Sequence, residues 1–308
     1  MRVYFLCISL FWISNNGLLA QTCCSGGVPV ASNLGLPPSE KGAIQLSLGY
    51  DLNVLETLKT GRKILEDDSR SRKTHTGLFE IGYSFSDKFS VDAFLSYVRQ
   101  EREINQFNNR NFSATNGIGD AVLLFKYKLF NTPNNHTIIQ MGVGPKFPLG
   151  ASDKRNEQGL TINADLQPGS GAWDLITWGQ LVQVLPFRPS MSFNLTAIYS
   201  RKGVNDNYLG SQAYQFGQEV QLALGISERI TIGNLLFDPA ITLRYRRQAE
   251  DVLNDFSVPS TGGNWLFINP SISYWPMPDL SFEATLTCLL YTSPSPRDLS
   301  TSRMPSSA

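Results

Sequence analysis

The chain has 308 residues, and its 26 basic and 26 acidic side chains cancel to a formal net charge of zero. This balance, without any basic stripe, argues against a surface that binds nucleic acid. After the first twenty or so residues the sequence has no apolar run of about 18 residues, which excludes a membrane-spanning helix there.

The first 41 residues predict export. Residues 1–20 have the pattern of a secretory signal peptide, with Arg2 before an apolar stretch and Ala20 before the expected cleavage site. Residues 21–41 are rich in Gly, Pro and Ser, and we interpret them as a periplasmic lead-in. They include Cys23 and Cys24, which are adjacent and cannot easily bridge each other. We interpret both as part of an exposed terminus; a metal or a thiol partner is the alternative.

From residue 43 onward, apolar and polar residues alternate in segment after segment. Ile44, Leu46 and Leu48 alternate with Gln45 and Ser47, and a β-strand directs such neighbours to opposite faces. The predicted strands are 43–55, 73–86, 89–99, 119–130, 137–149, 172–185, 191–199, 214–226, 230–246, 264–275 and 280–288. The strand at 172–185 has the least regular phase, because Trp173, Leu175, Ile176 and Trp178 do not alternate.

The connections between these segments are alternately long and short. The long ones are 56–72, 100–118, 150–171, 200–213 and 247–263, and the short ones are 86–88, 131–135, 186–190, 227–229 and 276–279. Long extracellular loops and short periplasmic turns are typical of outer-membrane barrels. The sequence therefore predicts an all-β fold, a transmembrane antiparallel up-and-down β-barrel over residues 42–288.

The end of the chain breaks the pattern. Bacterial barrels have even strand numbers, whereas about 11 strands are predicted here. From residue 289 the alternation stops, just after Cys288, and a Ser- and Pro-rich stretch follows that resembles the translated read-through of a sequencing adapter. We predict that 289–308 is a disordered, non-native tail, which replaces the last loop and the twelfth strand of a natively 12-stranded barrel.

Alternation alone fits a soluble, lipocalin-like barrel equally well, because such a barrel places its apolar face inside. Three features favour the membrane barrel: Gly and Ser dominate the polar face, aromatic residues gather near strand ends, and the strands outnumber the eight of typical soluble barrels. The expected location is the outer membrane of a Gram-negative bacterium. The expected partners are the lipid bilayer, lipopolysaccharide and the barrel-assembly machinery.

Two strand-rich stretches carry a family resemblance. Residues 117–130 and 142–150, following a signal peptide, resemble the outer-membrane transporter family named for the meta pathway of phenol degradation. The resemblance extends over most of residues 40–288, and the Cys-Cys start resembles members from the Bacteroidetes. It implies a twelve-stranded barrel that moves small apolar or aromatic compounds, and it brings no catalytic motif.

Charged residues lie on the polar face of the predicted strands. A charge facing lipid at mid-depth would cost about 2–4 kcal/mol, so these side chains are expected to point inward. They form either a constriction that selects solutes or a set of neutralising pairs that stiffens a narrow barrel. The predicted lumen-lining residues are Asp51, Glu80, Asp92, Asp120, Lys126, Lys128, Lys146, Glu219, Arg244, Arg246 and Glu283.

The sequence does not favour an enzyme. Its two histidines, His75 and His136, are expected at opposite ends of the barrel, and no hydrolase, metalloprotease or phosphate-loop motif occurs. We expect no cofactor, no metal and no catalytic residue. The predicted function is passive transport of small solutes, including hydrophobic or aromatic ones. The alternatives are a non-conducting receptor, adhesin or scaffold that acts through its long loops and, more remotely, an outer-membrane enzyme.

Overall fold

The computed structural model describes residues 40–56, 58–60, 63–65, 70–106, 109–132, 134, 136–259 and 261–293. The predicted signal peptide, nearly all of the predicted lead-in with Cys23 and Cys24, and residues 294–308 lie outside this part of the chain. Among the described residues, no helix is long and apolar enough to cross a membrane.

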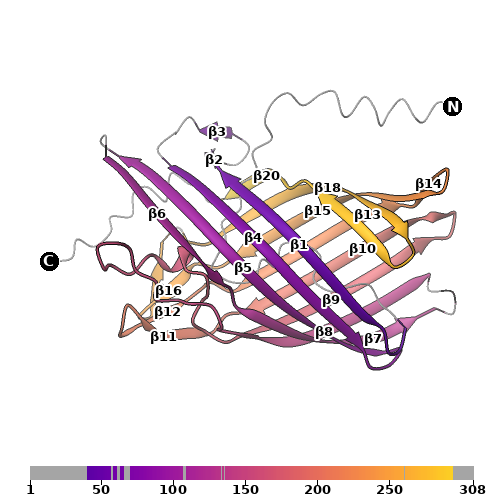
Figure 1. The fold of residues 1–308 in the computed structure, drawn as a ribbon, viewed down its shortest axis with the longest axis horizontal. Helices are drawn as coiled ribbons and strands as arrows, with labels where there is room; N and C mark the ends of the chain where they lie inside the picture. The colour runs from indigo at the N-terminus through magenta and orange to yellow at the C-terminus, as the bar shows by residue number, and fades with distance from the viewer. Residues whose placement is uncertain are drawn as a thin grey trace.

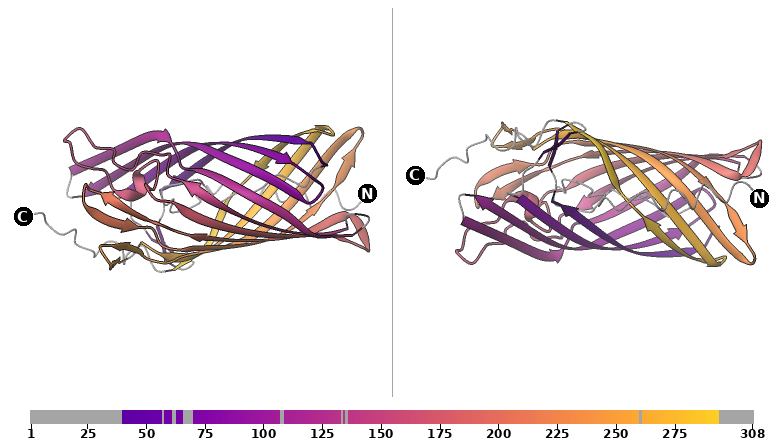
Figure 2. Two further views of the ribbon diagram at one scale, coloured as in Figure 1. Left: turned by 90° about the horizontal axis from the view of Figure 1, so that it is seen from below. Right: turned by 90° about the horizontal axis from the view of Figure 1, so that it is seen from above.

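One antiparallel sheet, curled into a barrel wall, dominates the structure (Figures 1 and 2). Each strand pairs with the next along the chain, which confirms the predicted all-β, up-and-down architecture. The eleven strands, in order, are β1 (Ile44–Leu55), β4 (Arg70–Ser84), β5 (Phe89–Gln106), β7 (Ala121–Asn131), β8 (Thr137–Phe147), β9 (Asp174–Leu185), β10 (Arg188–Arg201), β13 (Glu219–Glu228), β15 (Leu235–Gln248), β18 (Gly263–Met277) and β19 (Leu280–Thr285).

Two predicted connections were wrong. Residues 100–118 do not form a polar loop, because β5 runs on to Gln106 and pairs with β6 (Asn109–Ile118) as a long hairpin. Its residues are mostly polar and have no regular apolar alternation, so the apolar pattern cannot reveal it. The turn predicted at 227–229 lies at Gly233 instead, between β14 (Ile230–Ile232) and β15. Gly233 has a φ of +62°, which glycine adopts readily.

The predicted tail boundary also needs correction. Residues 289–293 belong to the sheet, because β20 (Cys288–Ser293) pairs with β18 and continues the line of β19. Leu289 is buried against Trp265 and Phe267, which explains why the strand persists beyond the alternation. Cys288, the first residue of β20, is partly exposed.

Short strands occupy the long connections at one end of the barrel, which we call the loop end. β2 (Leu58–Thr60) pairs with β3 (Lys63–Leu65), and a small sheet contains β11 (Val204–Tyr208), β12 (Gln212–Gln215), β16 (Asp251–Leu253) and β17 (Phe256–Val258). The connection between β8 and β9 instead contains a single 3-10 turn, η1 (Ala164–Leu166). The opposite end, with short connections, is the turn end.

The two faces of the sheet differ as predicted. On β4, Glu80 and Ser84 are buried on the inner face, while Phe79, Ile81 and Tyr83 are exposed on the outer face. Such a continuous exposed apolar band is typical of a lipid-facing surface. It includes Leu46, Leu48, Tyr50, Leu95, Tyr97, Phe125, Tyr127, Met141, Val143, Leu175, Leu195, Tyr199, Leu222, Leu224, Ile226, Ile241, Leu243 and Ile272.

The inner face carries an apolar layer that the sequence analysis did not predict. Its buried members come from β5, β7, β9 and β10, with Leu78 of β4 packed against them: Phe94, Val122, Leu124, Ile176, Trp178 and Ile198. The irregular phase of 172–185 has the same origin. Trp173 and Leu175 are exposed outside, whereas Ile176 and Trp178 are buried inside.

Replacing Leu224 by Arg is expected to lower the free energy of unfolding in lipid vesicles by about 2–4 kcal/mol, since it places a charge at mid-strand facing lipid. Leu224 lies between Leu195 and Leu243 of the neighbouring strands. The control is Leu209→Arg, an exposed residue next to the β11–β12 turn, with an expected change within about 0.5 kcal/mol. Urea titration measures both, and equal losses would contradict the outward orientation.

Candidate functional site

The connection between β8 and β9 folds into the barrel. We call residues 150–171 the inner loop. Ile162, Ala164, Leu166 and Gln167 are buried, and their surroundings include inner-face residues of β5 and β6. This long connection therefore lies across the loop end of the lumen (Figure 2).

Asp120, between β6 and β7, joins the two ends of the inner loop. Its Oδ1 accepts a hydrogen bond from the Gly150 backbone N–H at 3.1 Å, and its Oδ2 accepts from the Ser170 N–H at 3.0 Å and the Ser170 hydroxyl at 2.7 Å. The glycines at this neck are needed for space, because a Cβ on Gly150 would lie 2.6 Å from the Cα of Gly169. The neck is thus closed by one buried carboxylate.

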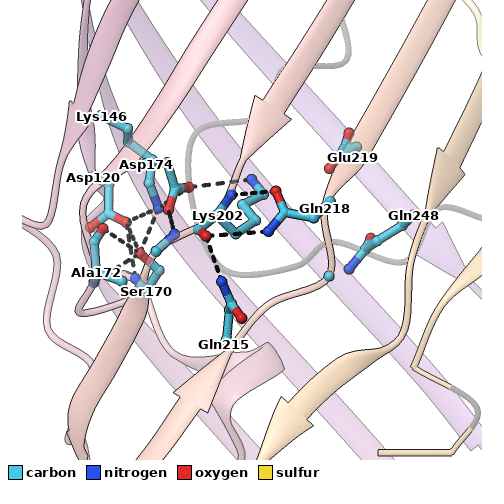
Figure 3. A network of polar contacts seen from close by, with 12 residues as sticks. Asp120, Lys146, Ser170, Ala172, Asp174, Lys202, Gln215, Gln218, Glu219 and Gln248 are labelled. Carbon is cyan, nitrogen blue, oxygen red and sulfur yellow. Dashed lines mark hydrogen bonds and ion pairs between the residues drawn. The ribbon is translucent and has the colours of Figure 1, made fainter. Parts of the chain in front are cut away.

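Asp120 is also the first member of a line of alternating charges around the inner wall (Figure 3). Lys146 Nζ lies 2.8 Å from Asp120 Oδ2 and 2.9 Å from Asp174 Oδ2. Lys202 Nζ lies 3.4 Å from the same Asp174 oxygen. Beyond Lys202, Glu219 on β13 pairs with Arg246 on β15, with Oε1 3.1 Å from Nε. We call these six residues the charge belt.

The belt's charges sum to zero, three carboxylates against three cations. Each buried charge therefore has an opposite charge nearby, which offsets the cost of removing it from water. The backbone nearby is also well bonded: Lys202 N–H donates to Gln218 Oε1 at 2.9 Å, and its carbonyl accepts from Gln215 Nε2 at 2.7 Å (Figure 3). A neutral belt of this kind does not favour solutes of one charge.

The opposite side of the inner loop rests on β4, β5 and β6. Arg72 NH1 lies 3.0 Å from Asp165 Oδ2, and Arg102 NH1 lies 3.6 Å from the same oxygen. Gln100 Nε2 donates to the Gln167 carbonyl at 3.3 Å, and the Thr115 hydroxyl donates to the Leu166 carbonyl. The loop is therefore held by these three strands as well as by Asp120.

Inner charges nearer the turn end also contact partners. Lys126 Nζ lies 2.5 Å from Asp92 Oδ2 and 5.7 Å from the ring centroid of Trp178.

On β15, two guanidinium groups stack on aromatic rings of β18. Arg244 is 4.6 Å from the Phe267 centroid and Arg246 is 5.3 Å from that of Trp265. Cation–π contacts of this type are strongest away from water.

The remaining predicted lumen-lining residues lie outside the charge belt. Glu80 is buried on the inner face of β4, and Lys128 is partly buried near the turn end. Asp51 and Glu283 are exposed on β1 and β19, the two ends of the described sheet, opposite the inner-face residues Thr76 and Ser273. The belt brings together Asp120, Lys146, Glu219 and Arg246 of the predicted set.

Five charged residues of the site were not predicted. Asp174 and Lys202 complete the belt, and Arg72, Arg102 and Asp165 hold the far side of the inner loop. Arg72, Arg102, Asp165 and Lys202 fall in segments that we predicted to be loops, and Asp174 lies in the strand of irregular phase. Even spacing from Thr74 and Gln100 could have assigned Arg72 and Arg102 to the inner face.

A cluster of aromatic rings covers the inner loop at the loop end. Tyr208 and Tyr214 have centroids 4.8 Å apart, and Phe216 meets Tyr214 edge-on at 5.2 Å. The Tyr214 hydroxyl donates to Asp251 Oδ2 at 2.6 Å. Burial and the adjacent carboxylate raise the pKa of Tyr214, so the hydroxyl stays protonated and keeps this hydrogen bond.

The two histidines do not meet. His75 Nδ1 is hydrogen-bonded to the exposed Tyr50 hydroxyl at 2.7 Å on the β1–β4 pair, whereas His136 precedes β8 at the turn end. Within the described ranges, no group of three or more His, Cys, Asp or Glu side chains is placed to hold a metal ion.

Replacing Lys146 by Met should lower the free energy of unfolding by about 3–5 kcal/mol, because Asp120 and Asp174 would remain buried without their shared cation. The double variant Lys146→Met/Asp174→Asn removes one charge of each sign, leaves Asp120 with its donors at the neck, and should recover part of the loss. Lys88→Met, in an exposed turn, is the control. Urea titration in vesicles checks all three, and a double variant less stable than Lys146→Met would contradict the neutralising role.

The chain is similar to a known protein family and to a solved outer-membrane channel. The sequence profile of a family described as "Putative MetA-pathway of phenol degradation" matches residues 71–290. The crystal structure of an outer-membrane channel from Pseudomonas putida F1 is similar, with a TM-score of 0.62 at 16% identity, over 85% of this chain and 91% of that chain. No curated protein sequence matches. Because the family profile matches well over half of the length of the chain, the chain belongs to the family named for the MetA pathway of phenol degradation.

Proposed function

We propose that the protein is a passive outer-membrane channel for small molecules, with hydrophobic and aromatic compounds as its solutes. The observation that carries this proposal is the pairing of an exposed apolar band outside with buried polar groups inside. The likeness of the fold to an outer-membrane channel and the family's association with phenol degradation support it.

Two inner features favour uncharged solutes. The charge belt is neutral, so it offers no net attraction to ions of either sign. The adjacent apolar layer, with Phe94 and Trp178, provides contacts that an aromatic or aliphatic solute can make. Because these side chains bury one another in this conformation, passage requires the inner loop or its neighbours to move.

The proposal includes the location of the barrel and its orientation in the membrane. We place the loop end outside a Gram-negative cell and the turn end in the periplasm, the orientation of outer-membrane barrels. The outer apolar band would contact lipid and lipopolysaccharide, and the barrel-assembly machinery would insert the chain. No catalytic step is assigned to the protein.

A non-conducting receptor or scaffold is the second candidate. The observation that favours it is the tight burial of the inner charges, with Asp92, Asp120, Lys126 and Lys146 each 3% exposed or less. The small sheet of β11, β12, β16 and β17 would offer a structured surface to a partner.

Conductance across planar bilayers separates the two candidates. Deleting residues 151–168 and joining Gly150 to Gly169, whose backbones already touch, removes the inner loop with little strain. The deletion is expected to raise the single-channel conductance about tenfold, because the loop end would hold only wall side chains. Liposome swelling with phenol should increase in parallel.

Removal of Glu157, Gln158 and Gly159 is the matched control. These exposed residues form the tip of the inner loop, outside the part that lies in the lumen, so conductance should match that of the wild type. If wild type and loop deletion are both silent while correctly folded, the channel proposal fails and the scaffold candidate stands.

A further inference from the structure

Two arginines face each other directly on the inner wall at the loop end. Arg72 on β4 and Arg102 on β5 are register partners, and both share the inner face with Thr74 and Gln100. Like charges placed opposite each other on neighbouring strands destabilise a sheet. Arg70, two residues before Arg72, lies on the same face and adds a third positive charge. This wall therefore requires an anion.

Asp165 of the inner loop is the carboxylate found there. Its Oδ2 alone receives both arginines, at 3.0 Å and 3.6 Å. Arg72 uses its other terminal nitrogen for Gln100 Oε1 at 2.5 Å and for the Asp165 carbonyl at 2.7 Å. Each guanidinium thus contacts this carboxylate through one nitrogen, although its planar geometry allows it to bind both oxygens of a carboxylate through two nitrogens.

Solvent can reach this ion pair. The Asp165 side chain is 38% exposed, whereas Arg72 and Arg102 are 12% and 22% exposed. The arginines are thus fixed in the wall, and the carboxylate is the accessible partner. An arriving carboxylate could offer one oxygen to each arginine, where Asp165 offers one oxygen to both.

We infer that Arg72 and Arg102 form a binding site for a small carboxylate anion, in which Asp165 of the inner loop acts as a built-in, displaceable ligand. The inference goes beyond the proposed passage of neutral solutes and does not depend on conduction. An anion that displaces Asp165 would remove one of the inner loop's anchors on this wall. Gln100 and Thr115 would still hold the following residues of the loop.

The test is calorimetric titration of the full-length protein in detergent with benzoate, using benzyl alcohol as the neutral probe of similar shape. Asp165→Asn should tighten benzoate binding about tenfold or more, because it removes the competing internal ligand. The Asp165 carbonyl still bonds Arg72 in that variant, so the loop keeps this contact. Arg72→Gln/Arg102→Gln should weaken benzoate binding about tenfold or more.

Matched variants make the test specific. Arg99→Gln, an exposed arginine of β5 paired with Glu101, should leave binding unchanged. Arg72→Lys keeps the charge but loses the fork, and should fall between the wild type and the double variant. Native-like circular dichroism is required of each variant. Equal binding of benzyl alcohol, no gain in Asp165→Asn, or an equal loss in Arg99→Gln would overturn the inference, whatever the channel conducts.

Discussion

The structure depends on one buried carboxylate, that of Asp120. Burying this charge inside the barrel is costly unless it is fully paired, and the pairing here comes from Lys146 and from three donors at the neck of the inner loop. The neck donors come from Gly150, the first residue of the loop, and from Ser170, the residue before its last. The group that stabilises the wall therefore also closes the loop, so the loop's place in the lumen follows from the need to satisfy Asp120.

The barrel interior is organised in layers along its axis. The charge belt and the inner loop lie towards the loop end, the apolar layer lies below them, and Asp92 with Lys126 lies beneath. Low dielectric strengthens each ion pair and penalises each unpaired group, which explains why opposite charges alternate from strand to strand. Once the loop end is open, a small apolar solute can contact side chains along the whole length of this neutral, well-packed interior.

The alternation of the sequence predicted the strands and their faces well, because one face of every strand is exposed to lipid and must be apolar. It predicted the inner face less well. Phe94, Leu124 and Trp178 point inward although they are apolar, since inner side chains need only pack together at mid-depth. The β5–β6 hairpin was missed because beyond the lipid band neither face needs apolar residues.

The candidate site was predictable only in part. Asp120, Lys146, Glu219 and Arg246 could be assigned inward because a charge in a spanning strand has no other favourable place. The donors to Asp120 could not be assigned, because Ser170 and Gly150 lie in a loop without periodicity, and only the folded chain brings them to the wall. The glycines at 150 and 169 are the sequence signal that remains, marking two backbones in close contact.

The most direct measurement is thiol labelling of the inner loop. In a background free of other cysteines, Leu166→Cys places the thiol at a position that is fully buried, so a water-soluble maleimide should not label it. Adding Asp120→Ala removes the acceptor that joins both ends of the loop, and labelling should then become rapid. Equal, rapid labelling with and without Asp120 would show that the loop does not lie inside the barrel, and would contradict this account.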